Sequence, residues 1–151
     1  MKKLILVIVL FLCGYVGYNQ YLPSSSSIFS DSETSLRAKS NNDEAFDSAF
    51  KNHASNLQLE GSGRVIKVLP DDTKGSQHQK FLVKLNSGQK LLIAHNIDLA
   101  PRVNSLSQGD QINFYGEYEW NAKGGVVHWT HRDPSGSHIA GWLEHNGKKY
   151  Q

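Results

Sequence analysis

The chain has 151 residues, of which 38% are hydrophobic, and this is enough for one domain with a modest core. Its 16 basic residues include Lys2 and Lys3, and without these two the basic and acidic residues balance at 14 each. A balanced charge excludes general coating of nucleic acid, and the single cysteine excludes an internal disulfide or a thiolate metal site in an exported domain.

The first 22 residues have the pattern of a bacterial export signal. Two lysines precede an apolar run that starts at Leu4, and Asn19 interrupts it before it reaches the roughly 20 residues that span a bilayer. Residues 1–22 are therefore predicted to be a signal peptide or a short anchor, the latter associating with the inner membrane through residues 4–18. Lipidation at Cys13 is an alternative, although cysteine is ordinary in an apolar segment. We expect an exported protein, either periplasmic or tethered to the inner membrane and facing the periplasm.

A polar linker and an amphipathic helix are predicted next. Residues 23–42 are rich in serine and asparagine, which is typical of a flexible linker. Over residues 43–56 the apolar positions repeat at helical spacing, and acidic residues in the first turn suit the helix dipole. The predicted buried face consists of Ala45, Phe46, Ala49, Phe50 and His53. We expect this short helix to dock on the main domain.

From residue 57 to the end, the pattern predicts a β-barrel domain. Apolar segments, most of them alternating with polar residues and bounded by Gly, Pro, Asn or Asp, indicate strands, and the Asn-Gly pair at residues 146–147 is a strong hairpin signal. The predicted strands cover residues 64–69, 79–85, 90–97, 110–120 and 126–131, followed by a hairpin of residues 141–144 and 148–150. This order predicts an all-β fold: a small five-stranded Greek-key barrel of the OB type with a short N-terminal amphipathic helix.

Polar side chains gather in three segments at the ends of these strands. One segment joins the first two strands, one follows the third strand, and the richest one follows the fifth. An OB barrel brings such loops and strand ends together at one end of the barrel. The candidate ligand-binding residues are His78, His95, Asn96, Asp98, His128, Trp129, His131, Arg132, Asp133 and His138.

Imidazole and carboxylate groups together suit a divalent transition metal such as zinc, manganese or iron. The candidate metal ligands are His95, His131 and Asp133, of which the last two share a face of the predicted strand. His128 and His131 would point to opposite faces unless the strand bends. The ordinary alternatives are a buried His95, which continues the apolar parity of its strand, and a plain turn at Asp133, which precedes a proline.

Several long and unusual strings extend from about Gly61 to the C-terminus. They are VLPDD (68–72), HQKF (78–81), HNIDLAP (95–101), GEY (116–118), GGVVHWTHRDP (124–134), H (138), GW (141–142) and YQ (150–151). In these strings the chain resembles an uncharacterised bacterial family of small exported proteins that carry a domain of unknown function. The resemblance supports one exported domain but implies no activity, cofactor or catalytic residue.

Two functional hypotheses and one structural one follow from these residues. The first is a binding module that holds a polar ligand, a glycan or nucleotide fragment, at the His/Asp/Trp-rich end of the barrel, where Trp129 would stack on the ligand. The alternative is a metal-assisted or His/Asp-dependent hydrolase, acting on a phosphodiester or similar bond, with His131, Asp133 and His95 as catalytic candidates. In the structural interpretation, the polar strings satisfy one another in a buried network.

Overall fold

The computed structural model describes residues 42–151. The predicted export segment and nearly all of the predicted linker lie outside these residues. Among residues 42–151, no helix has the length and apolar character needed to cross a bilayer.

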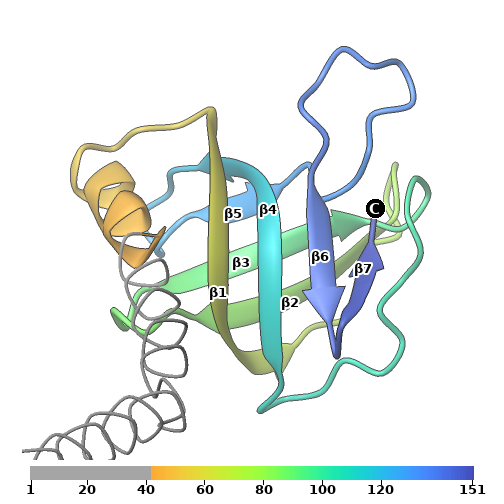
Figure 1. Cartoon of the computed structure of the whole chain (residues 1–151), viewed down its shortest axis with the longest axis horizontal. Helices are drawn as coiled ribbons and strands as arrows, with labels where there is room; N and C mark the ends of the chain where they lie inside the picture. Colours follow the sequence, from red (N-terminus) through yellow and green to blue (C-terminus); the bar gives the residue numbers. More distant parts are fainter. Residues whose placement is uncertain (1–41) are drawn as a thin grey trace, which may run out of the picture. The chain divides into compact units, whose positions relative to one another are not determined.

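The described residues form a closed β-barrel with an added hairpin (Figure 1). The strands are β1 (Leu57–Val68), β2 (His78–Lys84), β3 (Lys90–Asn96), β4 (Gln111–Glu119), β5 (Val126–His128), β6 (Trp142–His145) and β7 (Lys148–Tyr150). They follow the order β1-β2-β3-β5-β4-β6-β7, and a further pairing of β1 with β4 closes the first five into a barrel. Among these seven strands of residues 42–151, only β3 and β5 pair in parallel. This arrangement confirms the predicted small all-β, OB-like barrel.

Alternation along the strands places the core inside the barrel. On β2, β3 and β4, every second residue is buried, as the apolar pattern predicts. The outward positions of the same strands are half-buried or exposed and carry most of the polar side chains. The fully buried large side chains include Phe81, Leu91, Ile93, Ile112, Phe114, Tyr118 and Leu143.

β1 begins at Leu57, seven residues before the predicted start at Arg64, and this long strand is what closes the barrel against β4. The prediction missed its first half because Gly61 and Gly63 look like turn residues. In the structure both glycines are buried in the strand, where a side chain on Gly61 would collide with the ring of Phe114. The glycines therefore permit close packing inside the barrel rather than a turn.

A helix over residues 42–51 packs against the barrel, which confirms the predicted short amphipathic helix. Its anchor is Phe46, which is fully buried, with its ring centroid 5.8 Å from that of Phe114 and 5.7 Å from that of Tyr118. Such tilted and edge-on aromatic contacts add to the free energy gained from burial. The helix is thus held by the core of the barrel and not by its surface.

The helix ends at residue 51, five residues earlier than predicted. His53 takes a left-handed backbone conformation with φ of 52°, which stops the helix and turns the chain toward β1. At the other end of the helix, the carboxylate of Asp43 accepts a hydrogen bond of 2.8 Å from the backbone N–H of Ser87, in the turn that leads into β3. The helix therefore lies at the end of the barrel where β3 begins.

β5 ends at His128, three residues before the predicted end at His131. Its continuation is interrupted at Trp129, which has a left-handed backbone with φ of 50°. A bulky residue rarely adopts this conformation, and the cost is of order 1–3 kcal/mol. The chain then forms a long loop, residues 129–141, that leads to β6 and is closed by a 2.9 Å hydrogen bond from the N–H of Gly141 to the carbonyl of His131.

Candidate functional site

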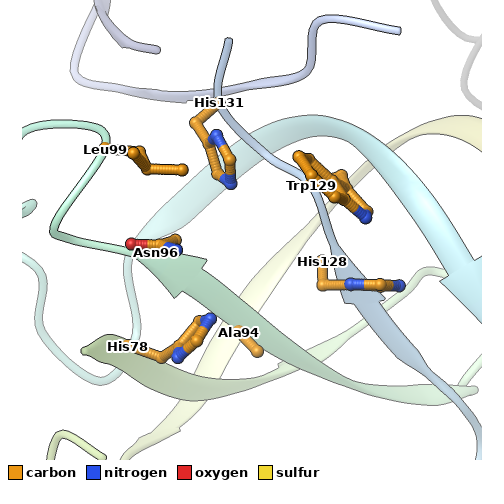
Figure 2. A pocket seen from close by; sticks show the side chains of 7 residues that line it. All are labelled: His78, Ala94, Asn96, Leu99, His128, Trp129 and His131. Carbon is orange, nitrogen blue, oxygen red and sulfur yellow. The ribbon is translucent and has the colours of Figure 1, made fainter. Parts of the chain in front are cut away.

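A pocket of about 150 Å³ lies on the outer surface of the barrel, where β3 ends (Figure 2). We refer to it as the outer-face pocket. Outward positions of β2, β3 and β5 form its floor, and the segments that follow β3 and β5 form its walls. The lining residues are His78, Ala94, Asn96, Leu99, His128, Trp129 and His131. Five of the ten residues predicted to bind a ligand therefore line one pocket.

The left-handed turn at Trp129 decides which histidines line this pocket. In a continuous strand, His128 and His131 would point to opposite faces. The turn reverses this relation, so both side chains line the pocket, together with the ring of Trp129 itself (Figure 2). The strand therefore does bend, which the sequence analysis gave as the condition for both histidines to point the same way. As a result, β5 and the residues after it bring two imidazoles to the site in place of one.

Two of the pocket histidines have a defined tautomer. Nδ1 of His78 donates a 2.8 Å hydrogen bond to the carbonyl of Ser76, and Nδ1 of His131 donates one of 2.8 Å to the carbonyl of Arg132. A carbonyl oxygen can only accept, so the proton is on Nδ1 in both neutral rings. Each neutral ring therefore presents the lone pair of Nε2 as its free hydrogen-bonding position.

His95 lies beneath the pocket and not in it. Its ring is fully buried, where Nε2 donates to the carbonyl of Pro101 at 3.3 Å and Nδ1 accepts from the hydroxyl of Thr130 at 2.9 Å. Burial lowers the pKa of His95 to about 4, and the hydrogen bond to Pro101 opposes this only partly. Through the hydrogen bond to its hydroxyl, the neutral ring helps to fix Thr130. Thr130 is also fully buried and lies in the chain between Trp129 and His131, which both line the pocket.

Asp98 fastens two loops at the edge of the pocket. Its carboxylate accepts a 2.7 Å hydrogen bond from the N–H of Gln77, in the loop before β2, and its own N–H donates to the side chain of Asn96 at 2.9 Å. Asp98 thus positions Asn96, which lines the pocket, but does not line it itself.

Asp133 holds together the loop after β5. Its carboxylate accepts hydrogen bonds from the hydroxyl of Ser135 at 2.7 Å and from the amides of Ser135, Ser137 and His138 at 2.8–3.0 Å. These bonds, the Ser135 hydroxyl first, lower the pKa of Asp133 to about 2. Asp133 therefore stabilises the conformation of its own loop. The neighbouring Arg132 is exposed to solvent.

Two glutamates that the sequence reasoning missed lie beside the pocket. Glu117 and Glu119 occupy outward positions of β4, and Glu117 pairs with His128 across the β4–β5 ladder. The two carboxylate oxygens of Glu117 face two histidines: Oε1 lies 3.3 Å from Nε2 of His128, and Oε2 lies 2.7 Å from Nε2 of His138. The alternation of side chains along β4 places both glutamates on one face of the strand. That Glu117 has His128 as its neighbour follows only from the register between β4 and β5.

The partners of His138 favour its charged form. Its Nε2 faces the carboxylate of Glu117 at 2.7 Å and its Nδ1 faces the carbonyl of Ile139 at 2.8 Å, and both of these oxygens accept a hydrogen bond from a protonated ring nitrogen. Burial opposes the charged form, but these hydrogen bonds and the charges of Glu117 and Asp133 together raise the pKa of His138. The ring also stacks on Trp129, with centroids 4.1 Å apart and planes 9° from parallel.

Burial has the opposite effect on His128. It lowers the pKa of this ring, and the nearby charges of Glu117 and Glu119 offset the effect only in part. His128 therefore favours the neutral form and His138 favours the charged form, with Glu117 between the two rings. A neutral His128 has a nitrogen lone pair that can accept a hydrogen bond or bind a metal ion. A charged His138 is suited to donate a hydrogen bond that orients the carboxylate of Glu117.

Only one group in residues 42–151 has the geometry of a small metal cluster. Glu117, Glu119 and His128 each offer a ligand atom, and these atoms lie within 4.8 Å of one another. The three metal candidates from the sequence are not gathered in this way, because His95 lies under the pocket and Asp133 braces the loop.

Comparison with known proteins agrees with the resemblance noted in the sequence. Residues 28–151 match the model of a family described as a protein of unknown function, DUF3465. The match starts well before Gly61 and includes the helix as well as the barrel. No curated protein matches the chain.

Proposed function

Because the chain belongs to the DUF3465 family, which carries no assigned activity, we propose from its geometry that it is an exported binding module for a small polar ligand. The observation that carries this proposal is the turn at Trp129, which brings His131 and the indole of Trp129 to a pocket that His78, Asn96 and His128 also line. Backbone strain at a bulky residue is typical of functional sites. OB barrels commonly bind their ligands on the outer face of β2 and β3, where this pocket lies.

The lining groups indicate the chemistry of the ligand. The Nε2 lone pairs of His78 and His131 and the amide of Asn96 suit a ligand with hydroxyl or amine donors. Trp129 adds an apolar ring that suits a sugar or a base. A volume of about 150 Å³ is well below the roughly 300–1,000 Å³ of pockets for drug-sized ligands. The pocket therefore fits a single ring, such as one unit of a glycan or one part of a nucleotide.

The positions of the three catalytic candidates, His131, Asp133 and His95, favour ligand binding over hydrolysis. His131 lines the pocket, but Asp133 makes its hydrogen bonds within its own loop and His95 makes its own with Thr130 and Pro101. No carboxylate is among the lining residues, and the one that faces a pocket histidine, Glu117 beside His128, also accepts a hydrogen bond from His138.

Ligand titration followed by amide NMR tests the proposal, with monosaccharides and nucleoside monophosphates as probes. We expect shifts at pocket residues, loss of binding in Trp129→Ala and weaker binding in His131→Ala. Trp142→Ala and His53→Asn are matched controls, because both residues lie outside the pocket, and they should bind as the wild type does. Turnover that is lost in His131→Ala while the probe still binds would favour a hydrolase instead. Shifts confined to other surfaces would refute the pocket.

Export is also part of the proposal. It is supported by the two lysines and the apolar run at the N-terminus, and the charge balance of the rest of the chain is compatible with a free periplasmic or tethered domain. Fusion of a reporter enzyme that is active only outside the cytoplasm to the C-terminus tests this point. Activity that disappears when Leu4 to Val9 are replaced by polar residues would support export, and an inactive wild-type fusion would contradict it.

A further inference from the structure

We propose that Glu117, Glu119 and His128 form a binding site for one divalent transition-metal ion of the zinc type, on the outer face of β4 and β5. The site does not depend on the ligand proposed for the outer-face pocket. The two are neighbours, however, because His128 lines the pocket and also faces Glu117.

The positions of the three side chains fit an ion. Their ligand atoms already lie within 4.8 Å of one another. In a tetrahedral zinc site with bonds of about 2.0–2.2 Å, neighbouring ligand atoms are roughly 3.4 Å apart. Glu119 extends from the same face of β4 as Glu117 and makes no side-chain hydrogen bond within residues 42–151, so rotation of its side chain can bring its carboxylate closer to the other two groups. Two carboxylates would neutralise the charge of the ion, and one imidazole favours zinc or manganese over calcium or magnesium.

Unsatisfied buried atoms at the same place point to a missing polar partner. Nε2 of His128 has almost no solvent-accessible surface and makes no hydrogen bond within residues 42–151, where Oε1 of Glu117 lies 3.3 Å from it. On the other side of Glu117, in register on β1, both polar atoms of the Gln58 amide are also buried and make no hydrogen bond to the described part of the chain. Buried polar groups without partners cost about 1–3 kcal/mol each. An ion with bound water supplies a partner to both side chains.

The loop after β5 provides the outer support that such sites need. Oε2 of Glu117 accepts the 2.7 Å hydrogen bond from His138, which leaves Oε1 facing His128. Trp129 stacks on the ring of His138, and Asp133 accepts a hydrogen bond from its backbone N–H. Carboxylates that bind metals are usually oriented in this way by a second hydrogen bond. The same loop that shapes the outer-face pocket thus also orients the carboxylate of the proposed metal site.

Zinc titration of the full-length chain, purified without a histidine tag and freed of metal with a chelator, tests the proposal. Isothermal calorimetry and elemental analysis after desalting should both give one zinc ion per chain. Glu119→Gln and His128→Gln should weaken binding by at least about tenfold, and His138→Asn by about 10–100-fold through the orientation of Glu117. Glu44→Gln makes the same change as Glu119→Gln on an exposed position of the helix, and should bind zinc as the wild type does.

Each outcome of this experiment decides the point. A protein that takes up no zinc from micromolar solution would overturn the proposal, and so would wild-type affinity in both Glu119→Gln and His128→Gln. Amide NMR spectra identify any variant that fails to fold, and Glu119→Gln provides the main test because Glu119 makes no side-chain hydrogen bond within residues 42–151. Since zinc alone is the probe, failure of the metal site would leave sugar or nucleotide binding in the pocket unaffected, and the reverse also holds.

Discussion

Mild acid should destabilise the barrel through His95. The folded protein keeps this ring neutral, because burial lowers its pKa from 6.5 to about 4. In the unfolded chain, the ring binds a proton near pH 6.5. The unfolded state therefore binds more protons throughout the interval between these values, and its free energy falls relative to the folded state as the pH decreases. Stability due to neutral His95 is complete above about pH 6.5 and is lost progressively down to about pH 4.

The size of this effect follows from the difference between the two pKa values. About 2.5 pKa units at 1.36 kcal/mol each correspond to a loss of about 3 kcal/mol, of which about 2 kcal/mol should be lost by pH 5. The loss is a large part of the 5–15 kcal/mol typical of a domain. A full protonation would also break the hydrogen bond that Nδ1 accepts from Thr130.

Urea unfolding followed by tryptophan fluorescence, at several pH values from 7.5 to 4.5, measures this loss. His95→Gln is the matched variant, because a neutral amide can donate to Pro101 and accept from Thr130 but cannot take up a proton. It should be less stable than the wild type at pH 7.5, since the amide fills the site less well, but should lack most of the decrease toward pH 4.5. Equal decreases in wild type and His95→Gln would refute the assignment to His95.

Three further predictions concern the elements around the site. Phe46→Ala should cost about 3–5 kcal/mol in urea unfolding, because it leaves a cavity between the helix and the barrel, and a loss below about 1 kcal/mol would show that the helix is dispensable. Gly125→Ala should cost about 3 kcal/mol or more, since the residue has φ of 108° and a Cβ there collides with the ring of Tyr118; an unchanged melting temperature would contradict this packing. Asp133→Asn should speed amide hydrogen exchange at His138 and its neighbours, because the charged acceptor of their hydrogen bonds is lost. Unchanged exchange there would show that the loop is held by other contacts.

The barrel was predictable because its strands show the two-residue period of a sheet with one buried face. Large apolar residues such as Phe81, Val83 and Ile93 recur at every second position and are buried, although outward positions such as Leu82 can also be apolar, and the turns between strands carry Gly, Asn or Asp. The ends of elements were less predictable. The start of β1 was hidden by Gly61, whose role depends on Phe114 more than 50 residues away, and the end of β5 depends on one left-handed residue, Trp129.

The location of the site was predictable from the sequence, but the role of each residue in it was not. His78, Asn96 and His131 were recognised as polar residues at strand ends, and the structure brings them together. The sequence could not show that Asp133 is engaged within its own loop, because an Asp before a turn looks the same in either role. Nor could it reveal Glu117, whose significance depends on the register between β4 and β5.

The closure of the barrel sets the order in which function can appear during folding. Leu57 pairs with Tyr118, and Leu92 of β3 pairs with Val126 of β5, so both pairings join segments far apart in the sequence. Contacts between such distant segments form slowly, because loop entropy is lost before they are gained. The pocket spans β2, β3 and β5, and the glutamate–histidine cluster spans β4 and β5, so a chain that has not yet formed β5 contains neither. Ligand or metal capture would thus be a property of the finished barrel alone, and a chain that crosses a membrane unfolded would arrive with both sites still to be built.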